Sequence, residues 1–338
     1  IPAISFTTVK TQTPASPLLG APVTYRIDVT NTGAGTLDAL TVVDTISPMV
    51  TGATTMTPSV YPSASMAQSA GGTVFTWSGG PLAWTAKTAM PTARRNLAAA
   101  AVGGKLYAVG GFNVTVLGTV HEYDPGTNAW TVKAAMPTPR ENLAVAAVNG
   151  RLYAVGGSNG ISLATVEAYD PAGNAWTSKT AMPTARYGLG AGVVAGKLYA
   201  VGGSDIGVLA VTEEYDPAKN AWSGKAPMPT ARNYLGVEVV DGVLYAIGGT
   251  AAGAVATVEA YDPATNTWTA RASLAAARYW VGTGVVDGKI YATGGYLGPV
   301  ATVEVYTPAK NAWQPAAGML TTRGAHAADG LNGKLYVV

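Results

Sequence analysis

Lys105-Leu106-Tyr107-Ala108-Val109-Gly110-Gly111 is the stretch that decides the fold, because the chain repeats it. Close copies occupy residues 151–157, 197–203, 243–249 and 289–295, and a shortened copy occupies residues 334–338. The tyrosines of successive copies are 46, 46, 46, 46 and 45 residues apart: Tyr107, Tyr153, Tyr199, Tyr245, Tyr291 and Tyr336. Six tryptophans keep the same period: Trp84, Trp130, Trp176, Trp222, Trp268 and Trp313. A fixed period in this range is typical of solenoids and propellers.

Composition narrows the classes of function. Only 12% of the 338 residues are charged and the net charge is +2, which argues against a nucleic-acid partner. Cysteine is absent and there are two histidines, so we predict no disulfide, no metal and no cofactor. No apolar run approaches the roughly 18 residues of a spanning helix, so we predict no membrane span. A surface rich in Thr, Ser and Ala and poor in charge favours an extracellular setting.

Each repeat divides into four segments that we interpret as strands a to d. In the second repeat they cover residues 143–148, 151–157, 165–171 and 174–177. The Gly-Gly pair after strand b predicts close backbone approach or positive φ. The periodic Tyr and Trp predict packing between neighbouring repeats. Dipeptides that tolerate positive φ predict two-residue hairpins between strands a and b: Asn149-Gly150, Asp241-Gly242, Asp287-Gly288 and Asn332-Gly333.

The apolar strand, Gly-Gly, Tyr on strand c, Trp on strand d and Arg before strand a together resemble the kelch motif over residues 82–338. The resemblance implies a β-propeller of four-stranded blades. We therefore predict an all-β protein with a six-bladed kelch propeller in residues 81–338. The fifth repeat departs from the pattern at Thr307, where the others have Asp, and at Leu274, where they have Met.

Residues 1–80 contain no copy of the repeat. Alternating segments at residues 5–10, 23–30, 40–44 and 73–77 predict a small β-sandwich that lacks a final strand. Residues 20–25, 29–33 and 42–45 resemble the conserved-repeat Ig-like domain of bacterial and archaeal surface proteins. This resemblance implies a spacer or adhesive module at a cell surface.

The two ends of the repeat array predict how the ring closes. Residues 82–87 match strand d, and residues 324–338 supply strands a and b. Together they predict a sixth blade built from both ends, without a strand c. Either the sequence stops short of the natural end or the blade is three-stranded, or else a strand from another molecule fills the gap. The last interpretation predicts head-to-tail assembly into a filament.

One arginine precedes strand a in every repeat, and a glutamate recurs on strand c. We favour a structural role between blades for this set, because residues repeated in every unit usually serve the scaffold. The alternative is an arginine ring that attracts an anionic sugar or a carboxylate. The set is Arg94, Arg140, Arg186, Arg232, Arg278 and Arg323 with Glu167, Glu213, Glu259 and Glu304.

Residues that break the repeat are the candidates for binding a partner. Aromatic rings with amide neighbours can stack on a sugar or on a partner's side chain, and ordinary loop packing is the alternative. They lie on the d–a loops: Glu141, Tyr187, Asn233, Tyr234, Tyr279 and Trp280. The short apolar b–c loops should lie on the same face and suit protein contacts. Asn113-Val114-Thr115, on one of them, is a glycosylation acceptor.

Enzymatic roles find little support. The kelch family includes a copper oxidase that uses Cys, Tyr and His, and this chain has no Cys. A sugar mutarotase needs only acid and base groups, for which Glu238, His326 and Asp329 are candidates; isolated polar groups near a wet channel are the alternative. We predict a non-catalytic extracellular structural or adhesive protein, whose partner is itself or another surface protein. Glycan binding or sugar mutarotation is the alternative.

Overall fold

The computed structural model describes residues 84–296 and 300–338 in full and, before them, the backbone of five strands within residues 6–78. The chain divides into two compact units, Ile1–Ala83 and Trp84–Val338. Strands dominate both, and the only helix in the described residues is the short 3-10 turn η1 (Pro308–Lys310). The predicted all-β class is confirmed. No helix in these described parts is long and apolar enough to cross a bilayer.

The first unit contains two antiparallel sheets. One pairs β1 (Phe6–Thr13) with β2 (Thr24–Asn31); in the other, β5 (Gly72–Ser78) lies between β3 (Thr41–Ile46) and β4 (Ser63–Ser69). Strand β4 was not predicted, because its Ser-Ala-Ser-Met-Ala-Gln-Ser sequence lacks β-branched and aromatic residues. The Ig-like assignment and its missing strand stay predictions, since the connections between these strands lie outside the described residues.

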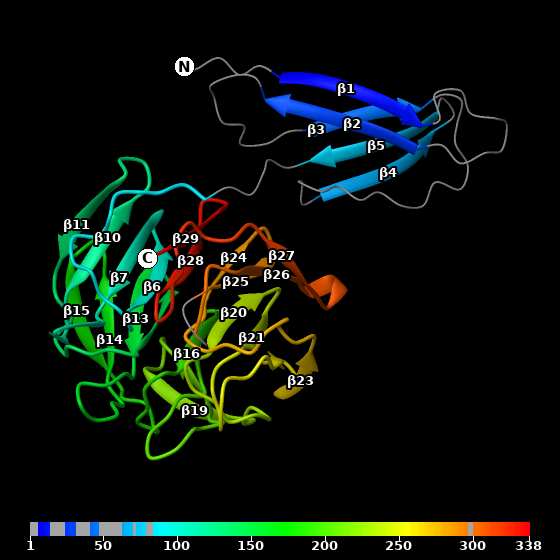
Figure 1. The fold of residues 1–338 in the computed structure, drawn as a ribbon. Helices are drawn as coiled ribbons and strands as arrows, with labels where there is room; N and C mark the ends of the chain where they lie inside the picture. Colours follow the sequence, from blue (N-terminus) through cyan, green and yellow to red (C-terminus); the bar gives the residue numbers. More distant parts are fainter. Residues whose placement is uncertain are drawn as a thin grey trace. The chain divides into compact units, whose positions relative to one another are not determined.

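The second unit contains five four-stranded antiparallel blades, each with its strands in chain order from the axis outward (Figure 1). Blades 1 and 2 contain β6 (Ala98–Val102), β7 (Lys105–Val109), β10 (Val120–Asp124) and β11 (Ala129–Lys133), then β12 (Ala144–Val148), β13 (Arg151–Val155), β14 (Val166–Asp170) and β15 (Ala175–Lys179). Blade 3 contains β16 (Gly190–Val194), β17 (Lys197–Val201), β18 (Thr212–Asp216) and β19 (Ala221–Lys225). Blade 4 contains β20 (Gly236–Val240), β21 (Val243–Ile247), β22 (Val258–Asp262) and β23 (Thr267–Arg271), and blade 5 contains β24 (Gly282–Val286), β25 (Lys289–Thr293), β26 (Val303–Thr307) and β27 (Ala312–Ala316).

Two smaller two-stranded sheets complete this unit. Strands β8 (Phe112–Asn113) and β9 (Thr115–Val116) form a small hairpin in the b–c loop of blade 1. Strands β28 (Ala328–Leu331) and β29 (Lys334–Val337) form a two-stranded sheet. The inner strands β6, β12, β16, β20, β24 and β28 contact one another in this order, and β28 also contacts β6, so the six strands surround a central axis.

The predicted six-bladed propeller is wrong: the described residues form five four-stranded blades, and the two-stranded β28–β29 sheet lies where we predicted a sixth blade of three strands. The expected strand d in residues 82–87 is also not found, since residues 84–90 have no strand and residues 82 and 83 lie outside the described part. The physical reason is that strand d hydrogen-bonds only to strand c, which no described segment supplies in this sheet. Trp84 is nevertheless placed as in a blade, because its Nε1 donates to Ala317 O at 2.8 Å.

Backbone preference fixes the tight turns. Asn149 and Gly150 have φ of 49° and 77°, which confirms the predicted two-residue hairpin between strands a and b. The Gly-Gly pair is required for close approach: a Cβ on Gly156 would lie 2.6 Å from Arg186 O, and one on Gly157 would lie 2.8 Å from Glu141 O. Any side chain at either position would therefore collide with the backbone of the adjoining loop.

The periodic aromatic residues pack between blades, as predicted. Tyr153 of blade 2 lies against Tyr215 of blade 3 with ring centroids 5.8 Å apart, within a cluster that also contains Leu189. Trp176 donates its indole N–H to Ala134 O, in the connection that follows blade 1, at 2.9 Å. Each blade thus buries its aromatic rings against the next one, and the core is continuous around the axis.

Candidate functional site

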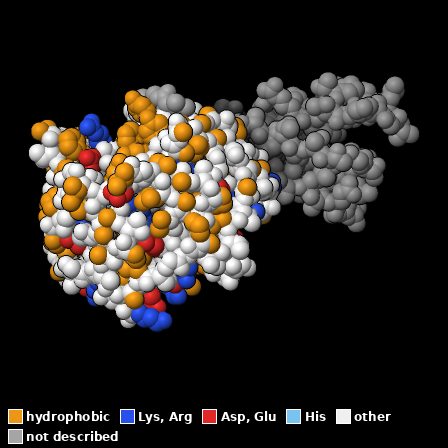
Figure 2. Space-filling view, turned by 90° about the horizontal axis from the view of Figure 1, so that it is seen from below, with side chains coloured by type: hydrophobic (Ala, Val, Ile, Leu, Met, Phe, Trp, Pro, Cys, Tyr) orange, Lys and Arg blue, Asp and Glu red, His pale blue; other side chains and the backbone are white. Residues whose placement is uncertain are grey.

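The d–a and b–c loops lie on one face, as predicted. Short antiparallel bridges join them within each blade, for example Glu141 with Ser158, Tyr187 with Ser204, and Tyr279 with Tyr296. We call this the loop face. Figure 2 shows one side of the molecule, on which hydrophobic side chains are scattered among uncharged ones and charged side chains are few. Low charge leaves this protein surface easy to desolvate.

Four of the six predicted partner-binding residues meet in one aromatic cluster. The ring of Tyr234 lies 6.1 Å from Tyr187, 6.4 Å from Tyr279 and 4.8 Å from Trp280. A fifth ring, Tyr296, lies 5.6 Å from Tyr279 and is 41% exposed. Sequence reasoning missed Tyr296, although the signal was available: it directly follows Gly-Gly, where blades 2 to 4 have Ser or Thr.

The other two predicted residues stay outside this cluster. Glu141 accepts a hydrogen bond from Asn96 Nδ2 at 2.7 Å. Asn233 is buried, with 6% of its surface exposed, and bridges to Thr250 through the backbone. Both residues therefore stabilise the loops between blades. Of the aromatic cluster, Tyr234 and Trp280 line one end of a central channel, the space that the six inner strands surround.

A ring of left-handed residues surrounds that end of the channel. The loop that leads into each inner strand contains one residue with φ between 51° and 62°. Around the axis these residues are Asn96, Asn142, Gly188, Tyr234, Trp280 and Ala325. Each of the first five donates its backbone N–H to the carbonyl of the preceding residue in the ring at 2.7–2.9 Å. For Asn96 that residue is Ala325, so this hydrogen bond joins the two ends of the array. Asn and Gly adopt this conformation readily, but a bulky side chain at positive φ is strained.

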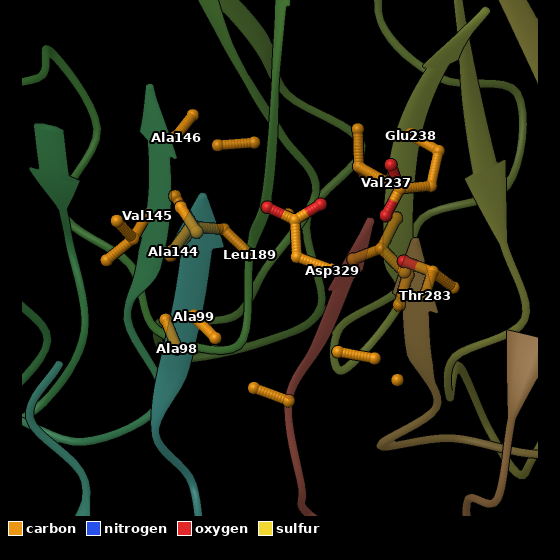
Figure 3. A pocket seen from close by; sticks show the side chains of 18 of the residues that line it. Ala98, Ala99, Ala144, Val145, Ala146, Leu189, Val237, Glu238, Thr283 and Asp329 are labelled. Carbon is orange, nitrogen blue, oxygen red and sulfur yellow. The ribbon is translucent and has the colours of Figure 1, made fainter. Parts of the chain in front are cut away.

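The central channel holds the three acid–base candidates. Its volume is about 370 Å³, and Glu238 of β20, Asp329 of β28 and His326 line it together with small residues. In Figure 3 the carboxyl groups of Glu238 and Asp329 point toward each other, opposite Ala98, Ala144 and Ala146. Asp329 accepts hydrogen bonds from the backbone N–H groups of Ala101 and Gly330, both at 2.7 Å.

Burial sets the protonation of these groups. Burial, and secondly the nearby Asp329 carboxylate, raises the pKa of Glu238 to about 8. Burial also raises the pKa of Asp329, against the effect of its two backbone hydrogen bonds. Burial lowers the pKa of His326 to about 4, so its imidazole is neutral near pH 7. The channel therefore has a protonated Glu238 and no fixed cation from its lining residues at neutral pH.

The repeated arginines lie inside the blades. Arg186 is completely buried and its Nη1 donates to Glu213 Oε2 at 2.7 Å. The same pairing joins Arg140 to Glu167, Arg232 to Glu259 and Arg278 to Glu304 at 2.6–3.1 Å. We predicted a role between blades for this set, but each Arg–Glu pair lies within one blade, because the loop before strand a ends beside strand c of its own blade. These guanidinium groups are occupied, and they do not form an open anion site.

The two ends of the array depart from this pairing. In blade 1, Arg94 Nη2 lies 2.5 Å from His121 Nδ1, because His121 occupies the strand-c position of the glutamate. Burial, and secondly Arg94, lowers the pKa of His121, which is therefore neutral. Arg323 precedes β28, is exposed, and has no ion pair among the described residues. No strand c pairs with β29 among the described residues, so the position of the glutamate partner of Arg323 is not filled there.

The remaining candidates are a glycosylation acceptor and a metal site. Asn113, the predicted glycosylation acceptor, is exposed at the start of the β8–β9 turn. Among the described residues, no group of three His, Cys, Asp or Glu side chains is arranged to hold a metal ion.

Comparison with known protein families identifies the type of repeat. Residues 73–203 match the KLHDC2/KLHL20/DRC7 Kelch-repeats domain, and residues 185–229, 231–275 and 277–320 each match the Kelch motif. The chain carries kelch repeats. The comparison with curated proteins gave no match.

A solved structure supports the kelch propeller fold. The chain is similar to a protein described as "Structure of YjhT", with a TM-score of 0.66 and 18% sequence identity. The match covers 75% of this chain and 92% of the other. At this identity the likeness concerns the fold alone, so the function must be argued from the loop face and the channel.

Proposed function

We propose that this kelch propeller is a non-catalytic binding module of an extracellular protein and acts through protein–protein contacts on its loop face. The observation that carries the proposal is a set of exposed aliphatic side chains on three consecutive b–c loops. Val114, Ile161 and Ile206 are 88%, 70% and 102% exposed. We call them the apolar loop tips. Water-exposed aliphatic groups in a row favour burial against a partner.

The partner that we propose is a second copy of the chain or another surface protein of similarly low charge. Removing the loop tips with Val114→Ser, Ile161→Ser and Ile206→Ser in one chain should raise the dissociation constant for self-association at least about tenfold, since interface anchors contribute more than 1 kcal/mol each. Sedimentation velocity over a range of concentrations measures this. Val132→Ser is the matched control, because Val132 is 66% exposed on the outer strand β11.

The outcomes are distinct. Equal self-association of the triple variant and of Val132→Ser would contradict a role of the loop tips. A wild-type protein that stays monomeric at every concentration would contradict self-association and leave another surface protein as the partner, which cross-linking on the intact cell surface then identifies.

The β28–β29 sheet supports a second contact, in which a strand from another copy adds to β29. In blades 2 to 5, strand c places a glutamate on the arginine before strand a and a tyrosine against the tryptophan of strand d, as in Tyr169–Trp176 at 5.1 Å. In the last sheet, Arg323 and Trp84 are in position, whereas strand c is not among the described residues. An incoming strand with this pattern would add hydrogen bonds, an ion pair and an aromatic contact.

A peptide with the sequence of residues 163–171, which includes the strand c of blade 2, should bind the sheet and raise the Tm. At ten times its Kd the stabilisation is about 1.4 kcal/mol, which corresponds to a Tm rise of about 3–5 °C. A peptide carrying Glu167→Lys should give a much smaller rise, because it repels Arg323. Equal effects of the two peptides, or no effect of either, would contradict strand addition and the filament that we infer from it.

Glycan binding or sugar mutarotation is our second candidate, and one observation favours it. Glu238, with a pKa raised to about 8, is a proton donor at neutral pH in a channel that also contains Asp329. Such a pair can supply an acid and a base to a sugar ring. Whether the propeller binds a protein or a sugar, we propose that the first unit, Ile1–Ala83, serves as an Ig-like spacer. The ligand series described below includes a neutral sugar and tests this candidate.

A further inference from the structure

The central channel has the volume of a binding site for a small molecule. Its volume of about 370 Å³ falls in the usual range of 300–1,000 Å³ for such sites. Small residues create the space. At the fourth position after the left-handed ring, four of the six inner strands carry Ala or Gly, namely Ala100, Ala146, Gly192 and Gly284. The other two carry the carboxyl groups, Glu238 and Asp329.

The negative charge of this pocket has no cation opposite it. Lys and Arg are absent from the lining residues of the channel, all of which belong to the described part of the chain. Glu238 faces Asp329 on β28 and His326 before it, while Thr283 on β24 is its hydrogen-bonding neighbour and Tyr245 on β21 is its partner in the sheet. None of these groups is a cation at neutral pH, so the lining residues supply no counter-charge to Asp329 or to Glu238 once it ionises, and a positive ligand would supply one.

The mouth of the same pocket has two strained aromatic residues. Tyr234 and Trp280 line it with φ of 53° and 51°, although the equivalent residues of the other blades are Asn, Gly or Ala. Such conformations cost on the order of 1 kcal/mol or more and are retained mainly at functional sites. Their rings lie 4.8 Å apart, and the buried Trp280 Nε1 has no hydrogen-bond partner among the described residues. Both residues line the pocket, so a ligand at its mouth would lie beside their rings.

We propose that the channel binds a small organic cation, an ammonium group, between the rings of Tyr234 and Trp280 and the carboxylates of Glu238 and Asp329. Aromatic faces attract ammonium groups, and the attraction is strongest where water is excluded. The carboxylates provide the long-range attraction, and the aliphatic wall of the channel accommodates the carbon skeleton. An anionic ligand would be repelled, and a neutral one would leave the carboxylates without a counter-charge.

The raised pKa of Glu238, about 8, couples cation binding to proton release. A cation favours the ionised carboxylate, so binding releases a proton from Glu238 whenever the pH is below about 8. The affinity for the cation therefore rises as the pH increases from 6 to 8 and levels off above.

Choline and its neutral carbon isostere, 3,3-dimethylbutan-1-ol, test the proposal on the full chain by calorimetry and ligand-observed NMR. Choline should bind at least about tenfold more tightly than the isostere, since a desolvated charge contact is what distinguishes them. Glu238→Gln with Asp329→Asn should remove this preference. Trp280→Asn should weaken choline binding at least about fivefold with the fold intact, because Asn adopts positive φ readily. Asp205→Asn, an exposed carboxylate on a b–c loop, should change nothing.

Equal binding of choline and the isostere, or no binding of choline at any pH from 6 to 9, would overturn the cation site. Binding of glucose that is lost in Glu238→Gln, without choline binding, would also overturn it and would support the sugar candidate. The variant without apolar loop tips should bind choline like the wild type, so a failure of the protein-contact proposal is distinguishable from a failure of the cation site.

Discussion

Replacing Glu213 with Gln should destabilise the propeller by about 3–5 kcal/mol, the cost of leaving a buried charge without its partner. Arg186 is 0% exposed, and its Nη1 lies 2.7 Å from Glu213 Oε2. Thr184 Oγ1 also donates to Glu213, at 2.8 Å. Burial lowers the pKa of Arg186, while the Glu213 carboxylate opposes the shift, so this carboxylate supplies the counter-charge of a guanidinium that stays charged in the core. Urea unfolding followed by tryptophan fluorescence measures the loss.

An exposed ion pair provides the control. Arg151 and Asp170 lie 3.2 Å apart with half-exposed side chains, so Arg151→Gln should cost less than about 1 kcal/mol. The double variant Arg186→Met, Glu213→Leu should recover most of the stability that Glu213→Gln loses, because a well-packed apolar pair avoids the unpaired charge. If Glu213→Gln cost no more than Arg151→Gln, Arg186 would have an alternative partner or access to water.

Glu238→Gln should stabilise the propeller at pH 9 and leave its stability unchanged at pH 4. The folded-state pKa of Glu238, about 8, lies well above the ordinary value of 4.5. Glu238 is protonated in both the folded and the unfolded chain below pH 4.5, so it costs the folded state nothing there. As the pH rises from 4.5 to about 8, the unfolded chain loses this proton first, and the free energy of unfolding falls. Gln cannot ionise, so the variant should be more stable by about 1–3 kcal/mol above pH 8, an amount reduced from the full shift because the channel admits water.

Thermal unfolding at several pH values checks this prediction, and the Tm of Glu238→Gln should exceed that of the wild type by several degrees only on the alkaline side. Asp205→Asn removes an exposed carboxylate and should give parallel curves at all pH values. Parallel curves for Glu238→Gln as well would mean that Glu238 is ionised in the folded protein at neutral pH, and that its carboxylate finds a counter-charge in the channel.

Local sequence determined the architecture of the single blade. The Gly-Gly pairs, the Asn-Gly and Asp-Gly turns and the alternation of strand residues act over a few positions through backbone sterics, so they are readable in one repeat and stronger in six copies. The aromatic period likewise indicated packing between blades, because a side chain that recurs every 46 residues must meet the same neighbour each time. The strand count of the last sheet was not readable this way, because a strand exists only where a hydrogen-bonding partner lies beside it.

The tertiary structure alone decided the candidate site. Glu238 and Asp329 are 91 residues apart, on sheets separated by blade 5, and only ring closure brings their carboxyl groups to face each other. The left-handed ring is equally non-local, since Asn96 donates to Ala325 across the junction of the array. The sequence by itself therefore determined the repeated unit, which short-range backbone forces specify, whereas closure around the axis decided which residues that break the repeat share one channel.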